Sequence, residues 1–228
     1  MRIEIATLFP EMCLNVLDES IIGRARKGGK IEVNCRNIRD YTQNKHRKVD
    51  DSPFGGGKGM VMQAQPIYDC YKAVCNDFGC VPHTIYMSPK GKPLTQKRVK
   101  ELALLSDILI ICGHYEGVDQ RVLDKIAPEE ISIGDYVLTG GELPALVLTD
   151  SIARLCEGVL PASECFEEES HWNGLLEYPQ YTRPEMWEGM PVPEILLSGH
   201  HKNIESWRLQ KSLELTKQLR PDMLESSK

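Results

Sequence analysis

The chain of 228 residues lacks any long apolar run. No segment reaches the roughly 18 apolar residues that a transmembrane helix needs. Its first residues alternate as in a strand, with Ile3 and Ile5, and do not have the architecture of a signal peptide. These absences predict a cytoplasmic protein that does not enter a membrane.

Paired cysteines are missing as well. The chain has 8 cysteines, but none forms a C-x-x-C pair and none stands with histidine at the spacing of a zinc site. Several lie inside apolar stretches. We therefore expect reduced, mostly buried thiols, with disulfides as the alternative.

Two nucleotide-binding fingerprints are absent. No G-x-G-x-x-G opens a helix, which excludes the ordinary dinucleotide-binding motif. The run Gly55–Gly59 is not a phosphate loop, because Lys58 is followed by glycine where serine or threonine is needed.

The net charge of −6 is distributed unevenly. Ten basic and four acidic residues lie between Ile21 and Lys58, a local charge of +6, which leaves −12 for the remainder. A positive field on an acidic body can still hold a phosphate backbone. An ordinary solvated surface is the alternative.

The most unusual segment is Ser132–Pro144, a short apolar stretch broken by Gly134, Gly140 and Gly141. Such a stretch cannot be a regular strand or a helix interior. It predicts backbone folded tightly around a ligand. A glycine-rich turn before a helix is the alternative.

Two further segments, each a predicted strand followed by a loop, precede this run. Residues 109–112 lead into Gly113–Gly117, and residues 84–87 lead into Ser88–Gly91. Ligands in open α/β sheets bind outside the carboxyl ends of the strands, so we expect the three loops to form one pocket. Few basic residues lie in these loops, which favours a nucleoside with a neutral or positive tail over a polyphosphate. Three ordinary connections are the alternative.

Strand and helix patterns alternate through residues 1–160 and predict an α/β domain with a parallel sheet. Helices are expected to begin at Pro10, Pro66, Thr95 and Leu143. The polar, acidic residues 161–173 predict a mobile linker. Residues 174–228 lack strand signals and predict a small helical domain with a long helix over residues 200–219.

Seven segments together resemble the TrmD family of bacterial tRNA (guanine-N1)-methyltransferases, which belongs to the SPOUT class. They run from the first strand to the last helix with compatible spacing. These segments are Leu8–Met12, His46–Asp51, Pro53–Met60, Cys112–Gly117, Ser132–Pro144, Gly174–Pro184 and Leu196–Gly199.

The resemblance implies a sheet domain threaded as a trefoil knot, which pattern analysis would not predict because knots are very rare. It also implies a homodimer with the pocket at the subunit interface. The implied reaction moves a methyl group from S-adenosylmethionine to N1 of the tRNA guanosine 3′ of the anticodon, position 37, when another guanosine precedes it. A magnesium ion is implied too, although the sequence shows no fixed ligand cage.

By resemblance, the three glycine loops hold S-adenosylmethionine. Apolar side chains would form the walls, glycines would let the backbone approach the adenine and ribose, and Glu116 would offset the positive sulfonium. The expected residues are Tyr86, Ser88, Pro89, Gly113, Glu116, Gly117, Ile133, Gly134, Tyr136, Leu138, Gly140, Gly141 and Pro144.

The family's catalytic arginine and aspartate fall on Arg154 and Glu169, so this chain departs from the pattern at the proposed base. Glutamate has similar basicity and about 1.5 Å more reach. A mobile linker could absorb that difference. Glu167 and Glu168 are adjacent competitors, and a purely solvated acidic run is the alternative.

The expected RNA contacts are divided between two segments. His46 and Arg47 would touch the RNA, and Asp50 would read the edge of a neighbouring guanine. Tyr181 and Arg183 are suited to stacking and phosphate contact, with a packed domain connection as the alternative. Two rival functions stay open: a noncatalytic RNA-binding protein that keeps the pocket, and a SPOUT enzyme that methylates another position such as a ribose 2′-hydroxyl.

Overall fold

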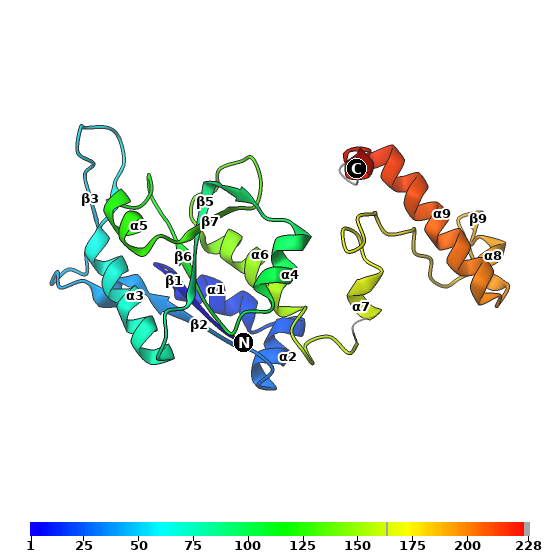
Figure 1. Cartoon of the computed structure of the whole chain (residues 1–228), viewed down its shortest axis with the longest axis horizontal. Coiled ribbons are helices and arrows are strands. Elements are labelled where there is room, and N and C mark those ends of the chain that lie inside the picture. The colour runs from blue at the N-terminus through cyan, green and yellow to red at the C-terminus, as the bar shows by residue number, and fades with distance from the viewer. Residues whose placement is uncertain (163, 226–228) are drawn as a thin grey trace. The chain divides into compact units, whose positions relative to one another are not determined.

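The computed structural model describes residues 1–162 and 164–225 (Figure 1). The chain divides into two compact units, Met1–Pro161 and Ala162–Lys228. The first unit is an α/β layer structure and the second is mainly helical, and each is described by itself.

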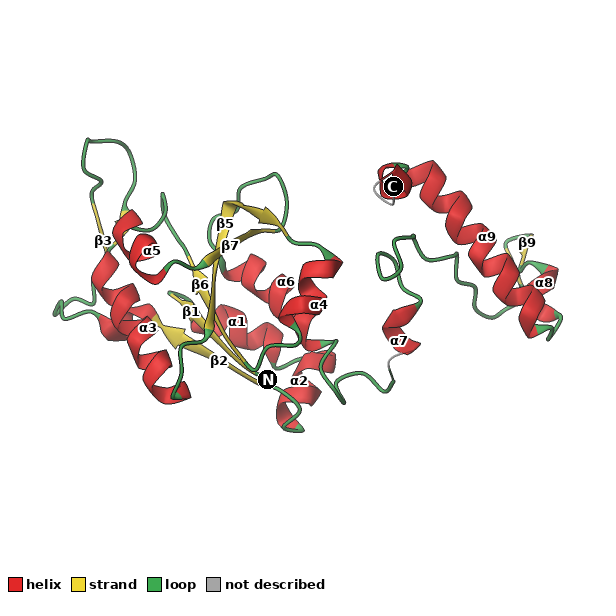
Figure 2. Ribbon diagram, viewed as in Figure 1, coloured by secondary structure: helices red, strands yellow, loops and turns green. Residues whose placement is uncertain are grey.

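Five parallel strands form the sheet of the first unit, in the order β2-β1-β6-β5-β7 (Figure 2). The strands are β1 (Arg2–Thr7), β2 (Glu32–Asn37), β5 (His83–Pro93), β6 (Asp107–Cys112) and β7 (Glu129–Ser132). This arrangement confirms the predicted α/β class with a central parallel sheet.

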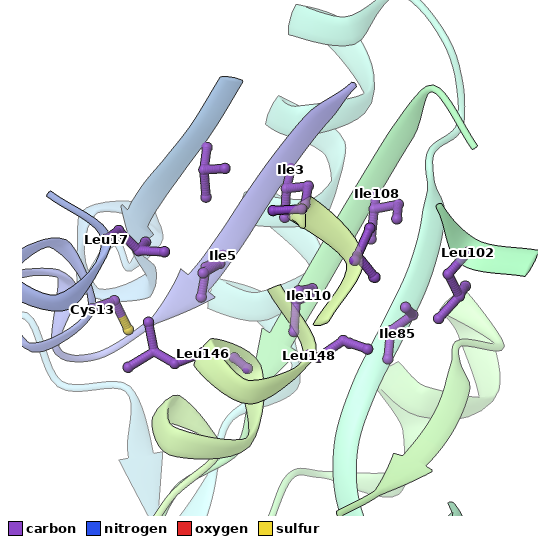
Figure 3. Close-up of a cluster of buried hydrophobic side chains, with 14 of the residues drawn as sticks. Ile3, Ile5, Cys13, Leu17, Ile85, Leu102, Ile108, Ile110, Leu146 and Leu148 are labelled. Carbon is purple, nitrogen blue, oxygen red and sulfur yellow. The ribbon is translucent and has the colours of Figure 1, made fainter. Parts of the chain in front are cut away.

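One face of the sheet is covered by α1 (Pro10–Leu17), α2 (Ser20–Lys27), α4 (Gln96–Leu102) and α6 (Glu142–Ala153). Figure 3 shows strand residues such as Ile5 and Ile110 close to Cys13 of α1 and Leu148 of α6. Alternate strand residues point to this face because the side chains of a strand have a period of two.

The opposite face is covered by α3 (Ala64–Phe78), α5 (Gln120–Ile126) and the short 3-10 helix η1 (Ile38–Tyr41). The intervening strand residues, among them Ala6, Leu109 and Ile111, point into this second core. Both faces are therefore buried, as expected for a parallel sheet.

Local signals explain the helix ends. Pro10 opens α1, and the hydroxyl of Thr95 accepts a hydrogen bond of 3.3 Å from the amide of Arg98 at the start of α4. Gly79, at φ +71°, ends α3 in the left-handed region that glycine tolerates. Helix α3 begins two residues before the expected Pro66, and α6 begins one residue before Leu143.

Strand β5 is longer than predicted. We expected it to end at Met87 before a loop at Ser88–Gly91, but it continues to Pro93. Both Met87 and Lys92 pair with Ile131 of β7, so the residues between them form a large bulge within the strand. A Cβ atom on Gly91 would lie 2.5 Å from the backbone of Glu130, which explains the need for glycine at this crossing.

A pair of short strands, β3 (Asp50–Asp51) and β4 (Val61–Met62), closes the loop that contains residues 53–60. Beyond β4 the chain enters α3. The amide of Met62 donates to Gly117 O at 2.9 Å, and that of Asp119 donates to Met62 O at 3.0 Å. These bonds attach the base of the glycine-rich loop to the segment after β6.

The second unit contains α7 (Glu164–Glu167), β8 (Met186–Trp187), β9 (Met190–Pro191), α8 (Glu194–Leu197), α9 (His201–Leu219) and α10 (Asp222–Glu225). Helix α9 confirms the long predicted helix. The expectation of no strands was wrong, because β8 and β9 form a small antiparallel hairpin. Glu188 and Gly189 at its turn both have positive φ, the conformation of a tight hairpin turn.

Helix α7 lies inside the segment predicted as a linker, and Ser163 in that segment lies outside the described residues. Across residues 1–162 and 164–225, no helix is long and apolar enough to cross a membrane.

Candidate functional site

A pocket of about 250 Å³ lies at the carboxyl ends of β5, β6 and β7. The three loops that follow or interrupt these strands converge on it, as the sequence predicted. All residues expected to hold the cofactor line this pocket: Tyr86, Ser88, Pro89, Gly113, Glu116, Gly117, Ile133, Gly134, Tyr136, Leu138, Gly140, Gly141 and Pro144.

The pocket is closed on one side by a backbone crossing. The amide of Gly141 donates a hydrogen bond of 2.8 Å to Gly113 O, and Gly140 pairs with His114 in an isolated antiparallel bridge. A Cβ atom on Gly141 would lie 2.7 Å from the Cα atom of Cys112. Glycine is required here because the start of α6 touches the end of β6.

The expectation that the glycines make room for a ligand therefore holds only in part. Cβ atoms on Gly113 and Gly140 would meet the hydroxyl of Tyr86 and the side chains of Glu142 and His114. Gly117 is different, because its φ of +131° excludes most other residues and its open side has no atom within 4 Å.

The walls of the pocket are apolar on two sides. Tyr86 is buried against the core of α3 and α5, and this burial raises the pKa of its hydroxyl to about 12. Opposite β5, the loop after β7 leaves Tyr136, Val137 and Leu138 exposed, with Val137 at 81%. Consecutive exposed apolar side chains of this kind mark a surface for a ligand or a partner.

His114 contributes an unsatisfied polar atom to this pocket. Its Nδ1 atom is buried and has no hydrogen-bond partner among the described residues. The ring is held between Phe9, at 5.1 Å between centroids, and Tyr115, at 4.8 Å. A buried polar atom without a partner is costly, and a bound molecule could supply the missing hydrogen bond.

Glu116 lies at the pocket rim against the glycine-rich loop. Its amide donates to Met60 O at 3.0 Å, and a Cβ atom on Gly59 would lie 2.5 Å from its carboxylate. The carboxylate is thereby held beside the pocket, where it favours a positively charged group in a ligand.

Arg154 is not at the pocket of its own chain. It caps the C-terminal end of α6, ten residues beyond Pro144, which corresponds to roughly 15 Å along a helix. It shares the accessible stripe of α6 with Leu143 and Val147, because these positions are four and seven residues apart, about one and two helical turns.

Glu169 belongs to the second unit, where the structure distinguishes it from its neighbours. Glu168 accepts a hydrogen bond of 3.0 Å from the hydroxyl of Tyr178 and lies 3.7 Å from Arg208. Glu167 is exposed, whereas Glu169 is half-buried and lines a hollow beside Asn173. Glu168 therefore has a structural role within this unit.

The predicted RNA contacts lie on both units. His46 and Arg47 occupy an exposed loop, in which Arg47 pairs with Asp40. Asp50 begins β3 at the end of that loop.

In the second unit, Tyr181 is half exposed with its ring 6.4 Å from that of Trp207, and Arg183 is exposed. Tyr181, with Trp207 beside it, and Arg183 are thus accessible for stacking and for a phosphate contact.

Sequence reasoning missed His114 and Tyr115 as pocket residues. Both lie inside the motif Cys112–Gly117, so the signal was present but was assigned to the glycines and Glu116 alone. All eight cysteines are unpaired, as expected, but the expectation that most are buried was wrong, because only Cys13, Cys70 and Cys112 are buried. Within the described part of the chain, no three His, Cys, Asp or Glu side chains are grouped so that they could hold a metal ion.

Comparison with known proteins agrees with this geometry. The family described as tRNA (Guanine-1)-methyltransferase TrmD matches residues 1–226. A tRNA (guanine-N(1)-)-methyltransferase of Ruminiclostridium cellulolyticum is 58% identical over 223 residues, which cover 98% of this chain and 96% of the relative. One of Clostridioides difficile is 56% identical over 228 residues, covering 100% of this chain and 99% of the relative. The chain thus belongs to the TrmD family of tRNA (guanine-1)-methyltransferases, a family of the SPOUT class.

Proposed function

We propose that this chain transfers a methyl group from S-adenosylmethionine to N1 of the tRNA guanosine 3′ of the anticodon, at position 37, when a guanosine precedes it. The observation that carries the proposal is the convergence of three loops, with every expected cofactor residue, on one pocket of a TrmD-family chain. Its relatives bear the name of this activity.

The residues of the pocket fit S-adenosylmethionine. Tyr86, Ile133 and Leu138 would hold the apolar adenine, and the unsatisfied Nδ1 atom of His114 can pair with a polar group of the ligand. When bound, the cofactor supplies a methyl group on a positively charged sulfonium, beside which Glu116 offers a carboxylate. For magnesium, the described residues offer no group of three His, Cys, Asp or Glu side chains that could hold the ion.

Two side chains would act on the guanine. The neutral base has a proton on N1, and we assign its removal to the carboxylate of Glu169, which acts as a general base. Negative charge then develops on O6, and the guanidinium of Arg154 would stabilise it by donating hydrogen bonds. His46, Arg47, Asp50, Tyr181 and Arg183 would hold the RNA so that the base is aligned for transfer.

The same assignment requires a homodimer. Since Arg154 is roughly 15 Å along α6 from its own pocket, it can serve only a pocket of a second copy. The surface needed for such an assembly exists: α1 exposes Met12 and Val16, and the neighbouring α6 exposes Leu143 and Val147. A contiguous apolar patch of this kind is typical of an interface.

We further propose that the sheet domain has the trefoil knot of its class. In support, the run that follows β7 crosses the end of β6 at Gly140 and Gly141 before α6 begins on one face of the sheet. Residues 161–173 would serve as the mobile linker that brings Glu169 to the pocket, residues 174–228 would bind tRNA, and the reaction would take place in the cytoplasm.

Methyl transfer to an unmodified tRNA transcript tests the function. We expect one methyl group per transcript, mapped to N1 of guanosine 37, and its loss when guanosine 36 is replaced. No transfer, with cofactor and RNA both bound, would favour a noncatalytic RNA-binding protein. A methyl group on a ribose 2′-hydroxyl or another base would assign a different SPOUT activity.

A further inference from the structure

Arg39 of η1 connects two segments that the proposed function assigns to different ligands. One nitrogen of its guanidinium donates to the backbone oxygen of Arg47 and another donates to the hydroxyl of Tyr115, each at 3.4 Å. Arg47 lies in the loop expected to touch RNA, and Tyr115 lines the cofactor pocket. A single side chain therefore contacts both the loop expected to touch RNA and the cofactor pocket.

Both segments are strained where Arg39 holds them. Arg47 has a φ of +55° and Tyr115 a φ of +60°, in the left-handed region that residues other than glycine rarely adopt. Such conformations cost free energy and persist only where the surrounding structure maintains them, most often at functional sites. Arg39 bonds directly to the backbone of Arg47, and it holds the side chain of Tyr115 through the hydroxyl.

Arg39 is itself well placed to act as a rigid link. The preceding Ile38 is fully buried, and the side-chain oxygen of Asn37 accepts a hydrogen bond of 3.0 Å from the amide of Arg39. Within the described part of the chain, Arg39 forms no ion pair, whereas its neighbour Asp40 pairs with Arg47. The guanidinium is thus occupied by a backbone oxygen and a phenol.

We propose that Arg39 is a positioning residue that couples the rim of the cofactor pocket to the RNA-contacting loop at residues 44–50. Occupation of the pocket restrains Tyr115, and through Arg39 this favours the loop conformation that receives RNA. This inference rests on the proposed function, because it takes the two ligands from it. By thermodynamic reciprocity, each ligand must then raise the affinity for the other by the same factor.

The test measures that factor by binding alone. The affinity for an unmodified anticodon stem-loop is measured by fluorescence anisotropy with and without S-adenosylhomocysteine, and the affinity for S-adenosylhomocysteine is measured by calorimetry with and without the stem-loop. In the unaltered protein we expect a coupling of at least about fivefold in both directions. In Arg39→Gln we expect it to fall below about twofold, with each ligand still binding.

Arg39→Lys separates positioning from charge. Lysine keeps the positive charge but cannot donate in a planar fork to two acceptors. We expect it to preserve the salt dependence of RNA binding and to lose the coupling. Tyr115→Phe, which removes one acceptor, should lose most of the coupling as well, and combining it with Arg39→Gln should cause no further loss. Lys97→Gln, an exposed single-charge change on α4, is the matched control and should retain the coupling.

The outcomes are distinct. If neither ligand binds the unaltered protein, the proposed function fails. If both bind without coupling, or if coupling survives in Arg39→Gln and Tyr115→Phe, the inference about Arg39 is wrong. Full coupling in Arg39→Lys would show that charge alone is sufficient, and this result also overturns the positioning role. Should Arg39→Gln fail to fold, Tyr115→Phe decides the question.

Discussion

At the scale of single residues, the acidic run at residues 167–169 shows how neighbouring carboxylates differ in role. Glu168 is engaged by Tyr178 and Arg208, Glu167 is exposed, and Glu169 is half-buried at the position of the family's base. Family resemblance singles out Glu169, but the sequence does not show how the surroundings of the three side chains differ. The contacts with Tyr178 and Arg208 give Glu168 a structural role within its unit, and the assignment of Glu169 as the base remains a proposal.

Glu169→Gln should lower single-turnover methyl transfer by about 100-fold, because the amide cannot accept the N1 proton. The affinity for S-adenosylhomocysteine should be unchanged, since Glu169 is not among the residues of the pocket. Rapid-quench transfer to an unmodified transcript gives the rate. Glu167→Gln is the control, and its rate of methyl transfer should be near that of the unaltered protein. A normal rate in Glu169→Gln, together with a large loss of rate in Glu167→Gln, would assign the base to Glu167.

Gly141 illustrates what sequence reasoning could and could not supply at this scale. Its membership of the pocket was predictable from the glycine-rich run. The reason for the glycine was not, because a local pattern does not show that the Cα atom of Cys112, at the end of β6, would lie 2.7 Å from a Cβ atom on Gly141. Arg39 was missed for a related reason, since its partners Arg47 and Tyr115 are brought together only by the fold.

Gly141→Ala should therefore lower the free energy of unfolding by about 1–3 kcal/mol through a clash with the backbone of β6. Gly29→Ala is a comparison within the same unit, because Gly29 has positive φ but no atom within 4 Å of its open side. It should cost about 1 kcal/mol, from backbone strain alone. Urea unfolding measures both, and a smaller loss in Gly141→Ala than in Gly29→Ala would contradict the proposed clash.

At the scale of elements, local chemistry predicted most helices and some strands. Pro10, Thr95 and Gly79 act within one turn of the helix that they begin or end, so their effects can be read from the sequence. The continuation of β5 to Pro93 depends on pairing with β7, and the hairpin of β8 and β9 has strands of only two residues. Neither leaves a periodic pattern that could be recognised in advance.

The edge of the sheet at β7 has a charged network that joins three elements. Glu129 of β7 accepts hydrogen bonds from Arg98 of α4, at 2.6 and 2.8 Å, and lies 2.6 Å from the ring of His83 of β5. Burial alone would raise the pKa of Glu129, but the hydrogen bonds from Arg98 and His83 outweigh it and lower that pKa below its ordinary value of 4.5.

A lowered carboxylate pKa predicts a specific pH dependence. The stabilisation by Glu129 should be fully present above about pH 4.5 and should be lost as the pH falls through the lower pKa of the folded state. Glu129→Gln should thus be less stable than the unaltered protein at pH 7 and should lose less stability between pH 5 and pH 3. Thermal unfolding across this range measures the effect. Glu101→Gln, which removes a more exposed partner of Arg98, is the control and should change the pH profile of stability less. Equal pH profiles of stability for the unaltered protein and Glu129→Gln would contradict this prediction.

At the scale of the whole molecule, the residues that we assign to catalysis are divided between the two ends of one helix and the two units of the chain. The pocket and Arg154 occupy opposite ends of α6, and Glu169 belongs to the second unit. The sequence identified each of these residues by family resemblance, but it gave no distance between them. The length of α6, which separates Arg154 from the pocket of its own chain, supports the dimer that we propose.

Val147→Glu should test that requirement most directly. Val147 is 45% exposed on the apolar stripe of α6, and a buried carboxylate at an interface costs several kcal/mol, enough to dissociate a dimer at micromolar concentration. Sedimentation equilibrium should show a dimer for the unaltered protein and a monomer for Val147→Glu, with the far-ultraviolet circular dichroism unchanged. Loss of the dimer should also lower the rate of methyl transfer, because Arg154 then has no pocket of a second copy to enter.

Leu104→Glu is the control, at a residue that is 86% exposed beyond α4. It adds the same charge outside the apolar patch and should leave both dimerisation and methyl transfer unchanged. A monomeric Val147→Glu variant with full activity would show that each chain is catalytically complete, and it would remove Arg154 from the reaction.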